Sequence, residues 1–71
     1  MLNTYELTIG CNEDGRIVRN YNRYVVLADN AKIACELIEK ELRKEEESVS
    51  EDVKISLFID GIKHLDEIDI S

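Results

Sequence analysis

The sequence lacks most of the features that identify a catalytic or metal-binding protein. It contains no proline, no tryptophan, two cysteines and one histidine among 71 residues. Such widely spaced cysteines and histidine are a poor ligand set for zinc, and no glycine-rich phosphate loop, HExxH or GxSxG motif is present. We therefore expect no enzyme activity, no cofactor and no metal. Cys35 is interpreted as a small core residue, Cys11 as a bystander at a strand end, and His64 as a solvated edge residue.

Long apolar runs and clustered positive charge are also missing. No segment is long and apolar enough to span a bilayer, and no signal-peptide pattern is found. Nine lysines and arginines stand against sixteen acidic residues, giving a net charge of −7. Because binding to nucleic-acid phosphates needs clustered basic residues, direct binding of DNA or RNA is not expected, nor is contact with an anionic membrane. We expect a cytoplasmic protein with reduced thiols.

One long helical pattern covers residues 30–46 and organises the rest of the chain. Asp29 and Asn30 are both good N-cap residues. Apolar residues then recur at spacings of three and four and form one stripe about 100° wide. The stripe consists of Ala31, Ala34, Cys35, Ile38 and Leu42, with Leu37 widening it on one side. Ile33 is predicted to point to the opposite, charged side, and the chain after Leu42 is predicted to extend past the core or fray.

Alternation of apolar and polar residues predicts four strands. Asp14-Gly15 and Asp60-Gly61 are hairpin signals, and a bulge or bend is expected near Tyr21. One helix on one antiparallel sheet gives a single α+β domain over residues 1–71, a two-layer ββαββ fold with strand order 2-1-3-4. The strands are expected at about residues 2–9, 17–28, 53–59 and 62–65.

A single helix covers only one face of such a sheet, so the sequence predicts an inner and an outer face. The inner set is Tyr5, Leu7, Ile9, Tyr24, Val26, Ala28, Val53, Ile55, Leu57 and Ile59. The outer face carries Val25, Leu27, Phe58 and Tyr21, where antiparallel sheets normally expose polar residues. Apolar residues clustered there predict an association surface for a partner or a second copy. The alternative is that the long side chains of Lys54, Arg19 and Arg23 shield them.

The junction between the second strand and the helix resembles one found in very small proteins of phages and mobile elements. Val26-x-Ala28-x-Asn30, followed by Ala34, is similar to the pattern V-x-A-x-(S/N)-x-x-x-A, although Ile33 replaces its usual acidic residue. The resemblance implies a ββα or ββαββ unit in a bacterial host. Small inhibitors of bacterial defence, including anti-CRISPR proteins, share this size and acidity. The resemblance assigns no functional residue.

Two functions fit these observations. The first is an acidic inhibitor or adaptor that binds another protein with a basic surface, its carboxylates occupying sites meant for nucleic-acid phosphate. The second is a structural, homodimeric module that associates through its sheet. Added salt weakens ion-driven binding but not apolar association. The residues expected to contact a protein are Val25, Leu27, Phe58, Tyr21, Ile33, Glu36, Glu39, Asp66 and Glu67.

Overall fold

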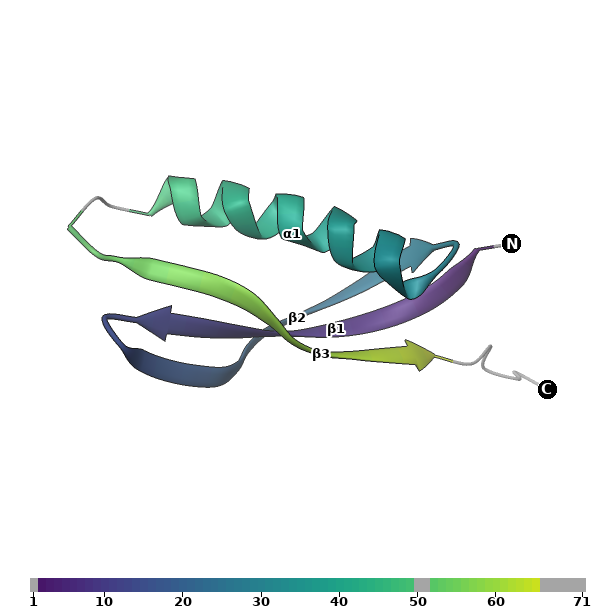
Figure 1. The fold of residues 1–71 in the computed structure, drawn as a ribbon, viewed down its shortest axis with the longest axis horizontal. Coiled ribbons are helices and arrows are strands. Elements are labelled where there is room, and N and C mark those ends of the chain that lie inside the picture. Colours follow the sequence, from purple (N-terminus) through teal and green to yellow (C-terminus); the bar gives the residue numbers. More distant parts are fainter. Residues whose placement is uncertain (1, 50–51, 66–71) are drawn as a thin grey trace.

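A computed structural model describes residues 2–49 and 52–65. The elements follow the order ββαβ, and the three strands form one antiparallel sheet with the order β2-β1-β3 (Figure 1). The α+β class and the neighbours of the central strand agree with the prediction. The ββαββ order is wrong, because the described part of the chain has three strands. The elements are β1 (Asn3–Glu13), β2 (Arg16–Ala28), α1 (Ala31–Ser48) and β3 (Ile55–Leu65).

The second predicted hairpin is absent, because β3 continues through Asp60-Gly61 without reversing. Thr8 of β1 lies opposite Gly61 and Ile9 lies opposite Ile59, so Asp60 is an extra residue on β3. An extra residue of this kind is a β-bulge. β3 does not reverse at Asp60-Gly61 because β1 continues to Glu13 and pairs with β3 along its whole length.

The first predicted hairpin is confirmed, with a tighter turn than expected. Asp14 and Gly15 both have positive φ, 50° and 85°, and the flanking Glu13 and Arg16 are paired. Two central residues with positive φ define the type I′ turn that Asp-Gly favours. The bulge expected near Tyr21 is also confirmed. A register shift separates Ile9 from Cys11 in the β1–β2 pairing, and Asn20 on β2 has a φ of 54°.

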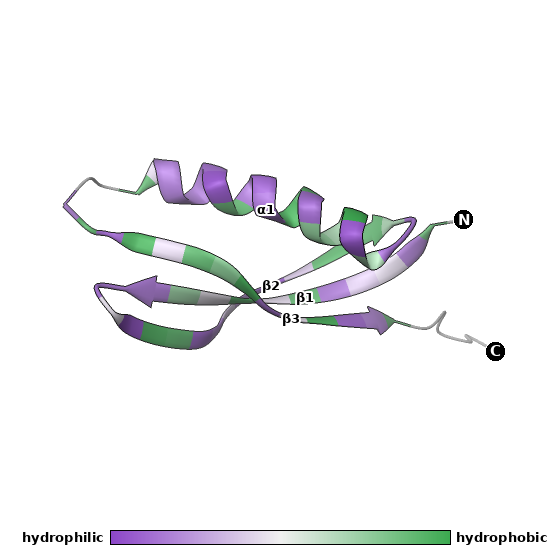
Figure 2. Cartoon of the chain, viewed as in Figure 1, coloured by the Kyte–Doolittle hydropathy of each residue, from purple (hydrophilic) through white to green (hydrophobic). Residues whose placement is uncertain are grey.

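The core lies between α1 and the inner face of the sheet, where apolar side chains of both layers meet. Figure 2 shows how hydrophobic and hydrophilic residues are distributed along these elements. The predicted inner set is confirmed at Leu7 and Ile9, which are fully buried, but Val53 is exposed and precedes β3. Cys11 is a core residue and not a bystander; its burial raises the thiol pKa, with a further contribution from Glu13. The buried apolar residues are Tyr5, Leu7, Ile9, Cys11, Ala28, Ala34, Ile38, Leu42 and Leu57.

The helix begins at the predicted cap and crosses a strongly twisted sheet. The Asn30 side-chain oxygen accepts a hydrogen bond from the Ile33 N–H at 2.9 Å. The first half of α1 lies beside β2 and its end lies beside β3, because the strands cross beneath it (Figure 1). Ile33 is therefore partly buried against the core, and the prediction that it joins the charged side is wrong. Leu37, predicted to widen the buried stripe, is 41% exposed.

The last turns of α1 dock on the sheet, contrary to the expectation that they extend past the core or fray. The Tyr24 hydroxyl donates a hydrogen bond to the Glu45 carboxylate. The Leu57 backbone N–H donates to Glu46 Oε2 at 2.6 Å. Glu46 therefore covers an N–H on the outer edge of β3 and fixes the end of the helix over that edge.

We expect Glu46→Ala to lower the free energy of unfolding by about 1.5 kcal/mol, because a partly buried N–H loses its charged acceptor. Glu46→Gln keeps a carbonyl oxygen at the same reach and should lose less. The matched control is Glu47→Ala, an exposed neighbour on the same helix, which should change stability by less than about 0.5 kcal/mol. Urea unfolding followed by circular dichroism measures all three. Equal losses for Glu46→Ala and Glu47→Ala would contradict the docking role.

Candidate protein-binding surface

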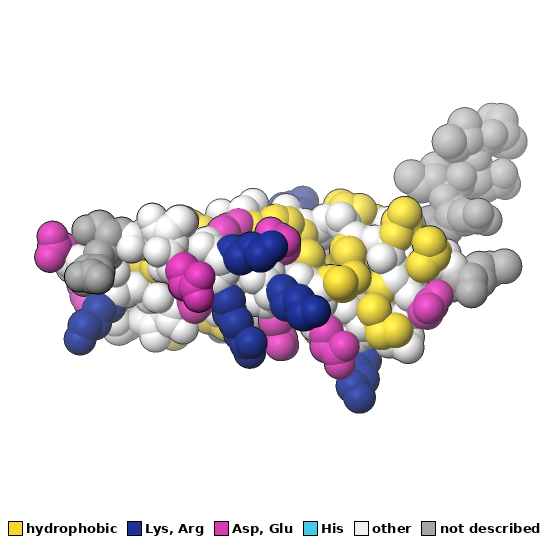
Figure 3. Space-filling model, turned by 90° about the horizontal axis from the view of Figure 1, so that it is seen from above, with side chains coloured by type: hydrophobic (Ala, Val, Ile, Leu, Met, Phe, Trp, Pro, Cys, Tyr) yellow, Lys and Arg dark blue, Asp and Glu magenta, His cyan; other side chains and the backbone are white. Residues whose placement is uncertain are grey.

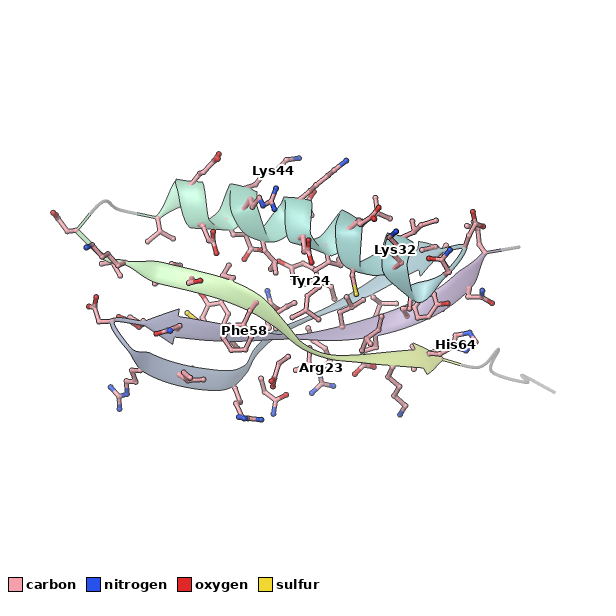
Figure 4. All side chains as sticks on the ribbon, viewed as in Figure 1. Arg23, Tyr24, Lys32, Lys44, Phe58 and His64 are labelled. Carbon is pink, nitrogen blue, oxygen red and sulfur yellow. The ribbon has the colours of Figure 1, made fainter. Side chains whose placement is uncertain are left out.

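Two exposed apolar side chains lie next to each other on the outer face of β2. Val25 and Leu27 are 66% and 58% exposed. They pair with Glu6 and Thr4 of β1, and side chains of directly opposed residues share a face of the sheet. Tyr24, the residue before Val25, has the opposite parity and points to the helix (Figure 4). The prediction that Val25 and Leu27 lie on the uncovered face is confirmed.

Charged side chains lie beside Val25 at one end of this apolar pair and leave both residues exposed. Arg23 Nη1 lies 3.7 Å from Glu6 Oε1, and Lys63 of β3 lies opposite Glu6. Arg19 is one of the residues that could shield the pair, but its Nη1 atom lies 3.8 Å from Asp60 Oδ1. An apolar centre with a polar, charged rim is the usual arrangement of a protein contact surface.

The hairpin geometry decides which backbone groups of β2 are used inside the sheet. A two-residue turn makes the flanking residues, Glu13 and Arg16, a hydrogen-bonded pair. Bonding then alternates along an antiparallel pair. The register shift between Ile9 and Cys11 does not change this alternation on β1, because every second residue from Tyr5 to Cys11 is buried on the same face. The set of β1 residues that bond to β2 is Glu13, Cys11, Ile9, Leu7, Tyr5 and Asn3.

Val25 and Leu27 lie opposite β1 residues outside this set, so their backbone N–H and C=O groups point to the free edge of the sheet. Arg23, two residues earlier, has the same orientation. Its N–H donates to the side-chain oxygen of Asn22 at 2.8 Å, as an N–H directed away from β1 can. The same two residues thus expose both their side chains and their backbone.

The outward-facing backbone groups are covered by a side chain at one edge of the sheet and not at the other. On β3, the Leu57 N–H is covered by Glu46. Within residues 2–49 and 52–65, no side chain hydrogen-bonds the backbone of Val25 or Leu27 in a comparable way. An open strand edge with apolar side chains is a template for pairing with another chain. The Asp14-Gly15 turn is a sequence signal for the alternation along β1, whereas the bulge near Tyr21 interrupts the alternation along β2.

The helix adds an apolar side chain near the same edge of the sheet, on the opposite face. Leu37 and Glu46 are nine residues apart, about half a turn around the helix axis. Because Glu46 contacts β3, Leu37 lies on the flank toward β2. Seen from the helix side, apolar side chains gather at the end where α1 begins, while the middle is charged (Figure 3). We call Val25, Leu27 and Leu37, with the free backbone of the first two, the β2 surface.

The other predicted apolar contacts do not join the β2 surface. Phe58 lies opposite Gly10, four residues along β1 from the partner of Val25, which corresponds to roughly 13 Å along the strand. Its ring packs over Gly10, where a Cβ atom would overlap it. Tyr21 is exposed in the irregular stretch of β2. The predicted single cluster is therefore split along the sheet.

The predicted acidic contacts are dispersed or lie outside the described residues. Glu36 and Glu39 are exposed on α1, and positive side chains interleave with negative ones over this face (Figure 3). Asp66 and Glu67 lie outside the described residues.

A hollow of about 260 Å³ lies between the second half of α1 and β3. Its lining mixes both charge signs with apolar side chains, which gives no single chemistry to a ligand. His64 stacks on Tyr5, with ring centroids 5.1 Å apart, so its ring packs on the sheet. No group of three metal-ligating side chains occurs in the described ranges. The hollow is lined by Glu39, Leu42, Arg43, Glu46, Leu57, Phe58 and Ile59.

None of the helices in the described part of the chain has the length and apolar character needed to cross a membrane. Comparison with protein-family models, curated proteins and solved structures finds no match in any of the three.

Proposed function

We propose that this chain is a non-catalytic module that binds another protein through the β2 surface. The observation that carries the proposal is the adjacent exposure of Val25 and Leu27, at 66% and 58%, on a sheet face that normally carries polar residues. A neighbouring ion pair, Arg23 with Glu6, supplies the polar rim. Exposed apolar patches with such rims mark interaction sites.

The role best supported is that of an adaptor or inhibitor whose contact is mainly apolar. Imitation of nucleic acid by carboxylates receives less support, because positive side chains interleave with the acidic ones on α1 (Figure 3). Two further glutamates of the helix, Glu45 and Glu46, bond to the sheet. An apolar contact differs from an ionic one in a measurable way, since salt screens exposed charges but not apolar burial.

The test is retention of partners from a bacterial lysate on immobilised protein, at low and high salt, with mass spectrometry. The Val25→Thr/Leu27→Thr double variant keeps strand-forming side chains while making the surface polar. The control is Ile17→Thr, the same kind of change at one other exposed apolar position of β2. We expect a protein retained at both salt concentrations by the wild type and the control, and lost by the double variant. Retention that is insensitive to Val25 and Leu27, or that disappears in salt, would overturn the proposal.

A further inference from the structure

We propose that the free edge of β2 pairs with β2 of a second copy, antiparallel and about a two-fold axis at Val26. The pairing makes one six-stranded sheet. This inference rests on the proposed function. The pairing would join Val25 and Leu27 of one copy with the same two residues of the second copy into one binding surface on the outer face. The inference concerns a contact of the edge, and a further partner would occupy the face.

The backbone supports this register. Pairing about Val26 places Val25 opposite Leu27 of the second copy, and Leu27 opposite its Val25. Both residues direct their N–H and C=O groups to the free edge. Each pair can therefore exchange two hydrogen bonds, while the backbone of Val26 remains bonded to β1. A two-fold axis makes the contact self-complementary and closed, so the pairing stops at two copies.

The side chains support the same register. Directly opposed residues share a face, so Val25 and Leu27 of both copies form a group of four on the outer face. The flank of α1 that carries Leu37 lies on the β2 side, together with the ion pair between Glu41 and Lys44, so the two helices present this flank to each other on the inner face. The pairing thus covers the free backbone of Val25 and Leu27 and leaves their side chains on the outer face for a further partner.

Charge selects this register over its neighbours. The strand β2 carries Arg16, Arg19 and Arg23 and no acidic residue, and Asp29 follows directly after its end. Pairing about Val26 places Arg23 opposite Asp29 of the second copy, twice by symmetry. A shift of the axis to Val25 would place Arg23 opposite Leu27 instead. Opposite charges across a strand pair are favourable, and like charges are unfavourable.

The first test is amide hydrogen exchange by NMR across a range of protein concentrations, beside sedimentation velocity. In the dimer, exchange at Val25 and Leu27 should slow by at least about tenfold as concentration rises, because these amides gain partners only there. Exchange at Tyr24 and Val26, already bonded to β1, should not depend on concentration. The sedimenting mass should reach twice the 8.2 kDa of the single chain.

The second test is a charge exchange between copies. Arg23→Asp and Asp29→Arg should each weaken the dimer, raising its Kd by about tenfold through two symmetric repulsions. An equimolar mixture of the two variants should restore dimerisation, because each copy then meets an opposite charge at both sites. Arg19→Asp, a charge change on the same strand beyond the pairing, is the control and should have no effect. Circular dichroism of each variant establishes that the monomer is folded.

The outcomes separate this inference from the proposed function. A mass of 8.2 kDa at millimolar concentration, with fast exchange at Val25 and Leu27 throughout, overturns the pairing. If a lysate protein is still retained through these residues, the proposed function survives. A dimer that the mixture fails to restore overturns the register. A dimer that retains no other protein overturns the proposed function and leaves the pairing intact.

Discussion

The variant Leu7→Ala is expected to be largely unfolded at moderate temperature. Leu7 is fully buried at the centre of β1, the middle strand, beneath α1. Truncation of such a leucine costs roughly 2–5 kcal/mol, because it removes apolar contacts and leaves a cavity. A domain of this size has a total stability of roughly 4–10 kcal/mol, so the loss is a large share. Thermal unfolding followed by circular dichroism should show a midpoint lowered by more than about 10 °C.

The matched control for this prediction is Ile62→Ala. Ile62 lies directly opposite Leu7 on β3, yet it is 42% exposed, since the helix has reached β2 at this end of the sheet. Its truncation should cost less than about 1.5 kcal/mol, because water already reaches the side chain. If the two variants lose similar stability, the placement of the core beneath α1 at Leu7 is wrong.

The dipeptide Asp-Gly shows how far local sequence predicts this fold. Asp14-Gly15 forms the expected turn, since both residues adopt positive φ and their neighbours pair at once. Asp60-Gly61 carries the same local signal but lies within a continuous strand. The difference comes from β1, which extends to Glu13 and pairs with residues on both sides of the bulge. Whether Asp60-Gly61 forms a turn therefore depends on strand partners that are distant in the sequence. A local sequence pattern carries no information about these partners.

The candidate site was predictable to the extent that alternation determines it. Period-two patterning assigned Val25 and Leu27 to the outer face, because each side chain alternates along a strand. The same rule assigned Phe58 to that face, but its distance from Val25 depends on the register of three strands. The docking of Glu46 on Leu57 was not predictable, since it depends on how α1 crosses the twisted sheet. Periodicity predicts which face of the sheet a residue occupies, but it does not predict which residues lie next to it on that face.

The pairing of Gly10 with Phe58 predicts a second large effect. The two residues lie opposite each other on β1 and β3, and the Phe58 ring fills the space above Gly10. In Gly10→Ala the new methyl group would overlap the ring, which must leave its position. We expect a loss of about 2 kcal/mol in the free energy of unfolding, the usual range for an overpacked contact. Urea unfolding monitored by circular dichroism measures it.

A double-mutant cycle separates this overlap from any general effect of changing a glycine in a strand. Alanine is at least as compatible with a strand as glycine, so without the ring the added methyl group should be neutral or stabilising. Gly10→Ala introduced into Phe58→Ala is therefore expected to cost nothing, and the two changes should be coupled by at least about 1 kcal/mol. The matched control is Thr8→Ala, a change on the same strand opposite Gly61, whose effect should be the same with or without Phe58. If Gly10→Ala costs as much in the absence of the ring as in its presence, Gly10 is required for the backbone of β1 and not for Phe58. The ring would then be as free to contribute to the outer face as Val25 and Leu27.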